Sequence, residues 1–179
     1  MHSYSIEQHS HLFAAWAASR AASVMGCRFS VALGRDVIES VGLLPSLSLP
    51  DQLPKPTETD SVHRNWRNTA CDFARTAGHP ITHGVAAKLI NCYLKSRFVC
   101  AGQQNHPNVA ALHPPIDKIL LEELAKQKFG SETKFWRASS KLGWSKFSSQ
   151  QYEDVISLIR LSMNDKPMWM IEEYWKGNQ

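Results

Sequence analysis

Residues 82–91 read Thr82-His83-Gly84-Val85-Ala86-Ala87-Lys88-Leu89-Ile90-Asn91, and residues 113–118 read His113-Pro114-Pro115-Ile116-Asp117-Lys118. The small residues of the first stretch predict a closely packed helix that carries Lys88. The two prolines of the second stretch stiffen the approach to Asp117 at the start of another helix. An amine beside a carboxylate can perform nucleophilic or acid–base chemistry, so the function depends on whether Lys88 and Asp117 meet in one pocket.

The composition is that of one globular domain, expected to span residues 1–179. The chain has 179 residues, of which 43% are hydrophobic and 20% are charged, as in ordinary soluble proteins. Its net charge is +4, and the segment 118–146 contains seven Lys or Arg residues against three Glu. Such a segment is typical of a nucleic-acid binder, although a solvated, lysine-rich helix face gives the same pattern.

The cysteines and the N-terminal region predict a cytoplasmic protein. Neither CxxC spacing nor a pairing pattern connects the four cysteines, Cys27, Cys71, Cys92 and Cys100. The apolar run 12–25 is interrupted by Arg20 and is too short to span a bilayer. A signal peptide would have a basic region before its apolar run, and this chain has none there.

Nearly every segment has the pattern of a helix, and no run of alternating β-branched residues predicts a sheet. We expect helices over 5–25, 31–41, 61–77, 83–98, 131–140, 148–163 and 168–176, and one that begins after Asp117. The proline-rich stretch 43–59 is expected to be a loop. In the helix over 61–77, the predicted core positions are Val62, Trp66, Thr69, Phe73 and Ala77. The predicted fold class is all-α, a single compact helical domain.

Asp117 is expected at the head of the apolar stripe of its helix. Leucines follow it by three, four and seven residues, which places the carboxylate at the edge of the interior. There it could take part in catalysis. The alternative is that Asp117 serves only as the N-cap of its helix, because aspartate is a common cap.

Lys88 is predicted to lie at a boundary between a polar strip of its helix (Gly84, Asn91, Lys95) and an apolar one. One interpretation is a surface lysine whose ammonium group reaches solvent. The other is a desolvated amine that attacks carbon as a Schiff-base nucleophile. The first-turn amides of the same helix, at Thr82, His83 and Gly84, are expected to bind a DNA backbone phosphate.

These residues resemble the helix-hairpin-helix superfamily of DNA glycosylases. In that superfamily a catalytic aspartate follows a proline-containing element at the start of a helix, and bifunctional members add a lysine on a preceding helix. Pro115-Ile116-Asp117 matches the aspartate element, and residues 86–93 are similar to the lysine helix. The separation of 29 residues is similar to that of the compact archaeal 8-oxoguanine glycosylases. Where the superfamily has a glycine-rich hairpin, this chain has His79-Pro80-Ile81-Thr82-His83-Gly84.

The resemblance implies an enzyme that flips a modified base out of DNA and cleaves its N-glycosidic bond to leave an abasic site. Asp117 would stabilise positive charge on the deoxyribose or deprotonate the nucleophile, and Lys88 would attack C1′ in a bifunctional enzyme. The pattern is also similar to a compact bacterial group that acts in anti-phage defence on DNA with α-glucosylated hydroxymethylcytosine. The implied partner is double-stranded DNA containing a modified base, with no cofactor, no metal, no membrane and no obligate protein partner.

Three alternatives stay open. The protein could be an 8-oxoguanine-type repair glycosylase/lyase, or a non-enzymatic all-α DNA-binding module in which Asp117 is a cap and Lys88 a phosphate contact. A metal-dependent nuclease is the third, although the histidines lack the spacing of metal ligands.

Four further residues are predicted for the base or substrate pocket. Trp16 and Arg20 share a helix face, so the indole could stack on a flipped base while the guanidinium holds a phosphate or a sugar hydroxyl. The alternative is a core tryptophan covered by an arginine. His113 is expected to line the same cleft as Asp117. Trp169, like Trp175, lies near the C-terminus, where related glycosylases contribute pocket aromatics.

Overall fold

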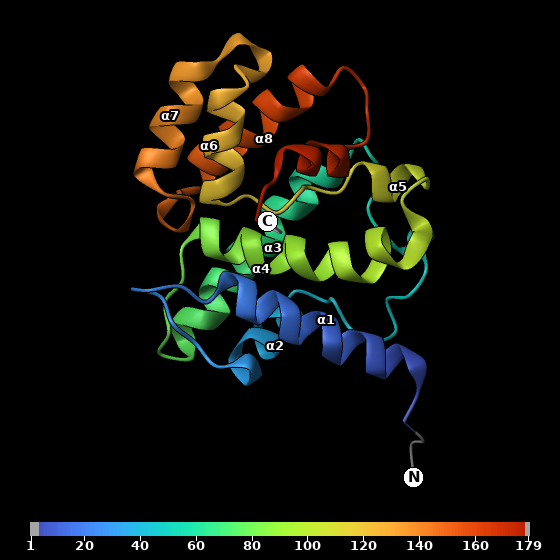
Figure 1. The fold of residues 1–179 in the computed structure, drawn as a ribbon. Coiled ribbons are helices and arrows are strands. Elements are labelled where there is room, and N and C mark those ends of the chain that lie inside the picture. The colour runs from blue at the N-terminus through green and yellow to red at the C-terminus, as the bar shows by residue number, and fades with distance from the viewer. Residues whose placement is uncertain (1–3, 178–179) are drawn as a thin grey trace.

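Helix α4, His83–Leu94, runs through the middle of the molecule, and other helices pack around it (Figure 1). The computed structural model describes residues 4–177. On one side of α4 lie α1 (Ile6–Ala22) and α2 (Val31–Ser40), and on the other lie α6 (Lys118–Lys126), α7 (Thr133–Leu142) and α8 (Ser149–Met163). Helix α3, Thr59–Thr76, contacts both α2 and α4.

The remaining elements are short: α5 (Pro107–Ala110), a π-helix (Lys95–Gln103) and 3₁₀ helices at Pro50–Gln52, Phe129–Ser131, Trp144–Lys146 and Met168–Tyr174. No strand forms within residues 4–177, so the all-α prediction is confirmed for the part of the chain that the structure describes. The buried apolar side chains of all the long helices belong to one core. No helix in the same range combines the length and apolar character needed to cross a membrane.

The predicted helix starts are confirmed at three capping residues. Ser30, Thr82 and Asp117 each accept a hydrogen bond from the backbone N–H three positions further along the chain. A side-chain acceptor at this position pairs one of the amides that the first helical turn leaves free. These caps fix where α2, α4 and α6 begin.

The buried face of α1 consists mainly of small residues, which allows α1 to pack closely on α4. It is formed by His11, Ala14, Ala15, Ala18, Ser19 and Ala22. The larger side chains of α1 point away from this contact: Phe13 and Trp16 are 60% and 50% exposed, and their rings lie 5.9 Å apart. The interpretation of Trp16 as a core tryptophan is therefore wrong.

The predicted core face of α3 is largely wrong. Thr69, Phe73 and Ala77 are exposed, and Val62 and Trp66 are only partly buried, although Trp66 packs against the core. The buried face is instead Thr59, His63, Arg67, Ala70, Cys71 and Ala74. Periodicity of apolar residues missed this face because two of its largest members are a histidine and an arginine, which are buried through polar contacts.

The helix predicted over 83–98 is not uniform. The α-helix ends at Leu94, and the chain continues as a π-helix over Lys95–Gln103 that includes Gly102 at φ 84°. Ten of the twelve residues of α4 are buried. Lys88 is therefore inside the molecule, and the prediction of a boundary lysine is corrected. A π-helix is uncommon and is frequently found at functional sites.

Candidate active site

Lys88 and Asp117 meet. The ammonium Nζ of Lys88 donates to the Asp117 Oδ2 atom at 3.0 Å, and Lys88 is only 8% exposed. Asp117 is held in place by its role as a cap, because its Oδ1 atom accepts the Leu120 N–H at 2.9 Å. The Nε1–H of Trp175 donates to the Oδ2 atom at 2.9 Å. The carboxylate thus accepts from an ammonium, an indole and a backbone amide, which together fix its position.

A cavity of about 240 Å³ lies beside this pair. Its lining comes from α1, α4, the π-helix, the segment before α6 and the C-terminal 3₁₀ helix: Ala17, Ala21, Lys88, Cys92, Lys95, Ser96, Pro115, Asp117, Glu172 and Trp175. The two alanines leave space that a larger side chain on α1 would fill. The alanines of α1 therefore have two roles: some pack in the core, and Ala17 and Ala21 leave room for the cavity.

A second ion pair, between Lys95 and Glu172, lines the same cavity. Burial disfavours the charged form of Lys95, but the hydrogen bond and charge of Glu172 outweigh it and raise the pKa of the ammonium. Lys95 also lies 5.9 Å from the centre of the Trp175 ring. The cavity therefore has a protonated lysine in addition to the Lys88–Asp117 pair.

Cys92 is the one thiol that lines this cavity. Burial raises its pKa, and the neighbouring Lys88 only partly offsets this effect. The thiol therefore stays protonated at neutral pH and is a poor nucleophile. This leaves Lys88 and Asp117 as the reactive groups of the cavity.

The ring of Trp144 also lies over Lys88, with its centre 5.7 Å from Nζ. This approach depends on Gly84: a Cβ atom there would lie 1.8 Å from the Trp144 carbonyl oxygen. The Gly84 N–H donates to the Phe147 carbonyl at 3.2 Å, and the Thr82 hydroxyl donates to the Ser145 carbonyl at 2.7 Å. The segment between α7 and α8 is thereby fixed against the first turn of α4.

The same contacts correct the predicted phosphate site at Thr82, His83 and Gly84. The protein's own segment 144–147 covers the first turn of α4, and the Gly84 and Val85 amides already have acceptors. His83 is partly buried and lies outside the cavity of Lys88 and Asp117. A DNA phosphate would have to displace the 144–147 segment to bind there.

His113 does not line the cavity of Asp117, contrary to prediction. It is buried, and its Nε2 lies 2.8 Å from Asp60 Oδ1 while its Nδ1 lies 3.1 Å from the Tyr152 hydroxyl. Because a carboxylate can only accept, Nε2 carries the proton and Nδ1 accepts from Tyr152. Burial lowers the pKa of His113, although Asp60 opposes the effect, so the ring is neutral.

His113 belongs to a buried network that reaches the loop before Asp117. The Asn91 Nδ2 group donates to the Tyr152 hydroxyl and to the Pro114 carbonyl, both at 2.9 Å. The Asn91 Oδ1 atom accepts from His63 Nε2 at 2.7 Å, which fixes the tautomer of that ring. The network therefore positions the prolines that precede Asp117, and its side chains do not line the cavity.

The other predicted pocket residues lie outside the cavity. Trp16 and Arg20 are exposed on α1, next to Ala17 and Ala21 but not part of the lining. Trp169 is partly buried, and its Nε1 is buried without a hydrogen-bond partner. The aromatic residue at the site is Trp175, six positions further along the chain.

Sequence reasoning missed Lys95 and Glu172 as site residues, and of the two C-terminal tryptophans it selected Trp169 and not Trp175. Lys95 did carry a signal, because it follows Lys88 by two helical turns on the same strip of the helix predicted over 83–98. Glu172 and Trp175 are three positions apart, which places them on one face of a 3₁₀ turn. No sequence pattern indicates that this turn folds back onto Asp117.

Comparison of the chain with models of protein families, with curated proteins and with solved structures finds no match. Within residues 4–177, no group of three or more His, Cys, Asp and Glu side chains is arranged to hold a metal ion. The interpretation of the site therefore depends on its geometry and on the resemblance at Lys88 and Asp117.

Proposed function

We propose that this protein is a DNA glycosylase that excises a modified base from duplex DNA. The observation that supports this function most is the 3.0 Å contact between the buried Lys88 amine and the Asp117 carboxylate, on the wall of a cavity of about 240 Å³. A cavity of this kind suits a single base rotated out of the helix better than an extended ligand. Trp175 offers an aromatic surface beside the carboxylate.

The chemistry follows from the two groups. When the N-glycosidic bond breaks, the base departs with the bonding electrons and positive charge develops on the deoxyribose. The Asp117 carboxylate stabilises that charge at short range in a partly buried site. If Lys88 first loses its proton to water, so that Asp117 keeps its charge, the lone pair of Lys88 forms a bond to C1′ as the base leaves. Ring opening then gives a Schiff base on Lys88, which water hydrolyses or which breaks the strand by β-elimination.

We further propose that the substrate base is a modified cytosine, with α-glucosylated hydroxymethylcytosine in phage DNA as the first candidate. The polar groups beyond Lys88 and Asp117 favour a base with a hydroxyl-bearing substituent, because Lys95, Glu172 and Ser96 line the same cavity. These groups can donate to and accept from sugar hydroxyls. An 8-oxoguanine substrate, as in base-excision repair, is the alternative.

A panel of duplex substrates tests the function. The purified protein is incubated with duplexes that contain α-glucosylated hydroxymethylcytosine, 8-oxoguanine, uracil or an alkylated base, and abasic sites are converted to strand breaks with hot alkali. We expect breaks only at the glucosylated cytosine. Breaks only at 8-oxoguanine would contradict a modified cytosine as substrate and would indicate a repair glycosylase. No break on any substrate would overturn the glycosylase proposal.

A non-enzymatic DNA-binding module is the second candidate function, favoured by the basic groove between α6 and α7. It predicts DNA binding with no base release from any duplex of the panel. A metal-dependent nuclease predicts breaks without alkali that disappear in EDTA, whereas base release by Lys88 and Asp117 should be unchanged by the chelator.

A further inference from the structure

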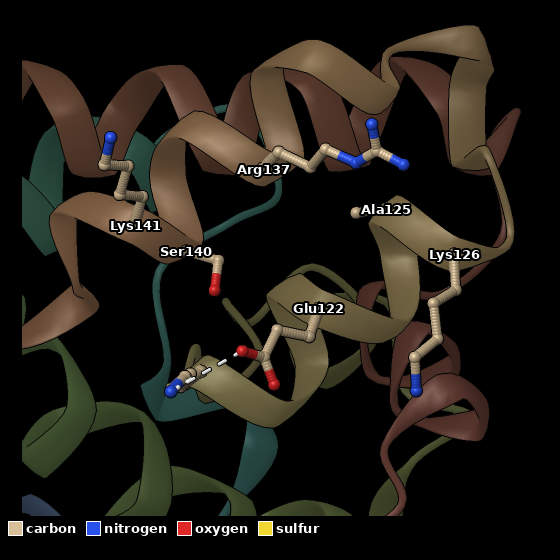
Figure 2. A pocket seen from close by; sticks show the side chains of 7 residues that line it. Glu122, Ala125, Lys126, Arg137, Ser140 and Lys141 are labelled. Carbon is tan, nitrogen blue, oxygen red and sulfur yellow. Dashed lines mark ion pairs between the residues drawn. The ribbon is translucent and has the colours of Figure 1, made fainter.

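A groove between α6 and α7, separate from the cavity of Lys88, has a basic lining. Its volume is about 510 Å³, and the lining residues are Lys118, Glu122, Ala125, Lys126, Arg137, Ser140 and Lys141. In Figure 2 the Arg137 side chain extends from α7 past Ala125, and Ser140 faces Glu122 across the groove. The groove thus has four cationic side chains and a single carboxylate.

The carboxylate does not cancel the charge of the groove. Glu122 lies 3.6 Å from Lys118, and Lys126 pairs with Glu123. Arg137 and Lys141 have no acidic partner among residues 4–177, and both are exposed. They are one helical turn apart on α7, so the two free positive charges face the same groove.

The length of the groove and its position indicate the ligand. Lys118 and Lys126 stand at opposite ends of α6, about 12 Å apart along the helix axis. A DNA strand has a phosphate about every 3.4 Å of duplex axis, so this length corresponds to three or four phosphates. Lys118 directly follows Asp117, so the groove begins where the candidate active site ends.

We propose that this groove binds the phosphate backbone of the DNA strand that carries the target nucleotide. The proposal rests on the proposed function for the choice of DNA as the polyanion. It places the strand along α6 and α7, and not on the first turn of α4, which the 144–147 segment covers. Arg137 and Lys141 contribute the main contacts, because they have no carboxylate to release before they bind a phosphate.

The test compares two double variants with equal changes of charge. Arg137→Gln/Lys141→Gln removes the two free charges of the groove. Arg28→Gln/Lys55→Gln removes one arginine and one lysine that are exposed outside it and have no ion pair among the described residues. Binding to an unmodified 20-base-pair duplex is measured by fluorescence anisotropy at several salt concentrations, after circular dichroism shows that both variants are folded.

We expect the groove variant to bind at least about five-fold more weakly at low salt, and the slope of log K against log salt to fall by about 1.8, which corresponds to two phosphate contacts. The control variant should bind like the wild type within about two-fold. Equal binding by both variants would overturn the proposal, as would equal weakening in both, since that would reflect net charge alone. Poly-glutamate that competes as well as DNA and needs the same two residues would assign the groove to acidic polypeptides and overturn it too.

This result is independent of base release. If the groove variant loses DNA binding while the wild type releases no base from any duplex, the glycosylase proposal fails and the groove proposal stands. If the wild type releases base and the groove variant binds DNA normally, only the groove proposal fails.

Discussion

The side-chain amide of Asn91 donates a 2.9 Å hydrogen bond to the carbonyl oxygen of Pro114. Asn91 follows Lys88 by three residues, and Pro114 precedes Asp117 by three residues. The bond therefore joins the helix that carries the amine to the loop that carries the carboxylate. It holds the Lys88–Asp117 distance from outside the cavity, in a part of the molecule that a ligand does not reach.

Removing this bond should separate the reactive pair. Asn91→Leu leaves the Pro114 carbonyl and the His63 Nε2–H without partners, and each unpaired buried group costs about 1–3 kcal/mol. We expect the free energy of unfolding to fall by at least about 2 kcal/mol in urea titrations, and base release to fall further than the unfolded fraction explains.

The matched control is Asn108→Leu. Asn108 also lies in the interior and donates to two backbone carbonyls, at Pro50 and Leu53, but it does not line the cavity. It should lose stability and retain the turnover of the folded fraction. Equal loss of turnover in both variants would contradict the positioning role of Asn91.

Replacing Asp117 by Asn should abolish base release. The amide oxygen can still cap α6, but the Nδ2 group that replaces Oδ2 cannot accept from Trp175 or Lys88, and the side chain carries no charge to stabilise the deoxyribose. We expect single-turnover base release to fall at least about 100-fold. Asp72→Asn, which alters an exposed carboxylate on α3, serves as the control. Near-normal turnover in Asp117→Asn would show that the charge of Asp117 is not needed for base release.

Lys88 is tested by trapping with borohydride, which reduces a Schiff base to a stable protein–DNA adduct. We expect the wild type to form an adduct and Lys88→Gln to form none, because glutamine has no amine that can attack C1′. Lys95→Gln is the matched control, since Lys95 lines the same cavity but is kept charged by Glu172. An adduct that persists in Lys88→Gln and disappears in Lys95→Gln would transfer the nucleophile to Lys95.

The stability of the protein should fall as the pH drops below about 6.5. Burial lowers the pKa of both His63 and His113 in the folded state, whose rings lie 4.3 Å apart. The unfolded chain therefore binds protons first, and stability that is present above the unfolded pKa is lost as the pH falls below it. Asp60 has a lowered pKa because of its hydrogen bond to His113, so its contribution is lost at more acidic pH.

Thermal unfolding between pH 7.5 and 5.0 checks this dependence. His63→Gln retains a donor for Asn91 but cannot titrate, so its melting temperature should change less over this interval than that of the wild type. His79→Gln, which alters an exposed ring, should follow the wild type. A wild-type melting temperature that is constant from pH 7.5 to 5.0 would contradict the neutral state of the buried rings.

Gly84→Ala should destabilise the protein although alanine favours helices. The new methyl group would lie 1.8 Å from the Trp144 carbonyl oxygen, which belongs to the backbone and cannot rotate away. We expect a loss of about 1–3 kcal/mol and a melting temperature lower by roughly 2–10 °C. Because Trp144 covers Lys88, adduct formation should fall as well.

Gly34→Ala is the comparison for this effect. There the new methyl group would lie 2.8 Å from the Ser19 Cβ, which a rotamer change does not move, and the contact is remote from Lys88. Gly34→Ala should therefore also lose stability but retain adduct formation. An unchanged melting temperature in Gly84→Ala would mean that the segment at Trp144 can shift freely.

The long helices, and the starting points of three of them, could be predicted from local sequence alone. The caps at Ser30, Thr82 and Asp117 are local, because a side chain that pairs an amide three residues away needs no other part of the chain. The all-α class follows in the same way from periodicity and propensity. The choice of Asp117 also had local support, since its position at the head of an apolar stripe is confirmed by the burial of Leu120, Leu121 and Leu124.

The surroundings of these residues, in contrast, depend on how the helices pack. Burial of Lys88 depends on helices from both ends of the chain, and the Trp175 contact to Asp117 spans 58 residues. Because of the same packing, His113 lies in a separate network and not in the cavity, and the segment at Trp144 covers the start of α4. Such contacts join residues far apart in sequence, and their stability comes from polar groups that pair only after the helices have packed. Such pairing cannot be predicted from a local sequence pattern.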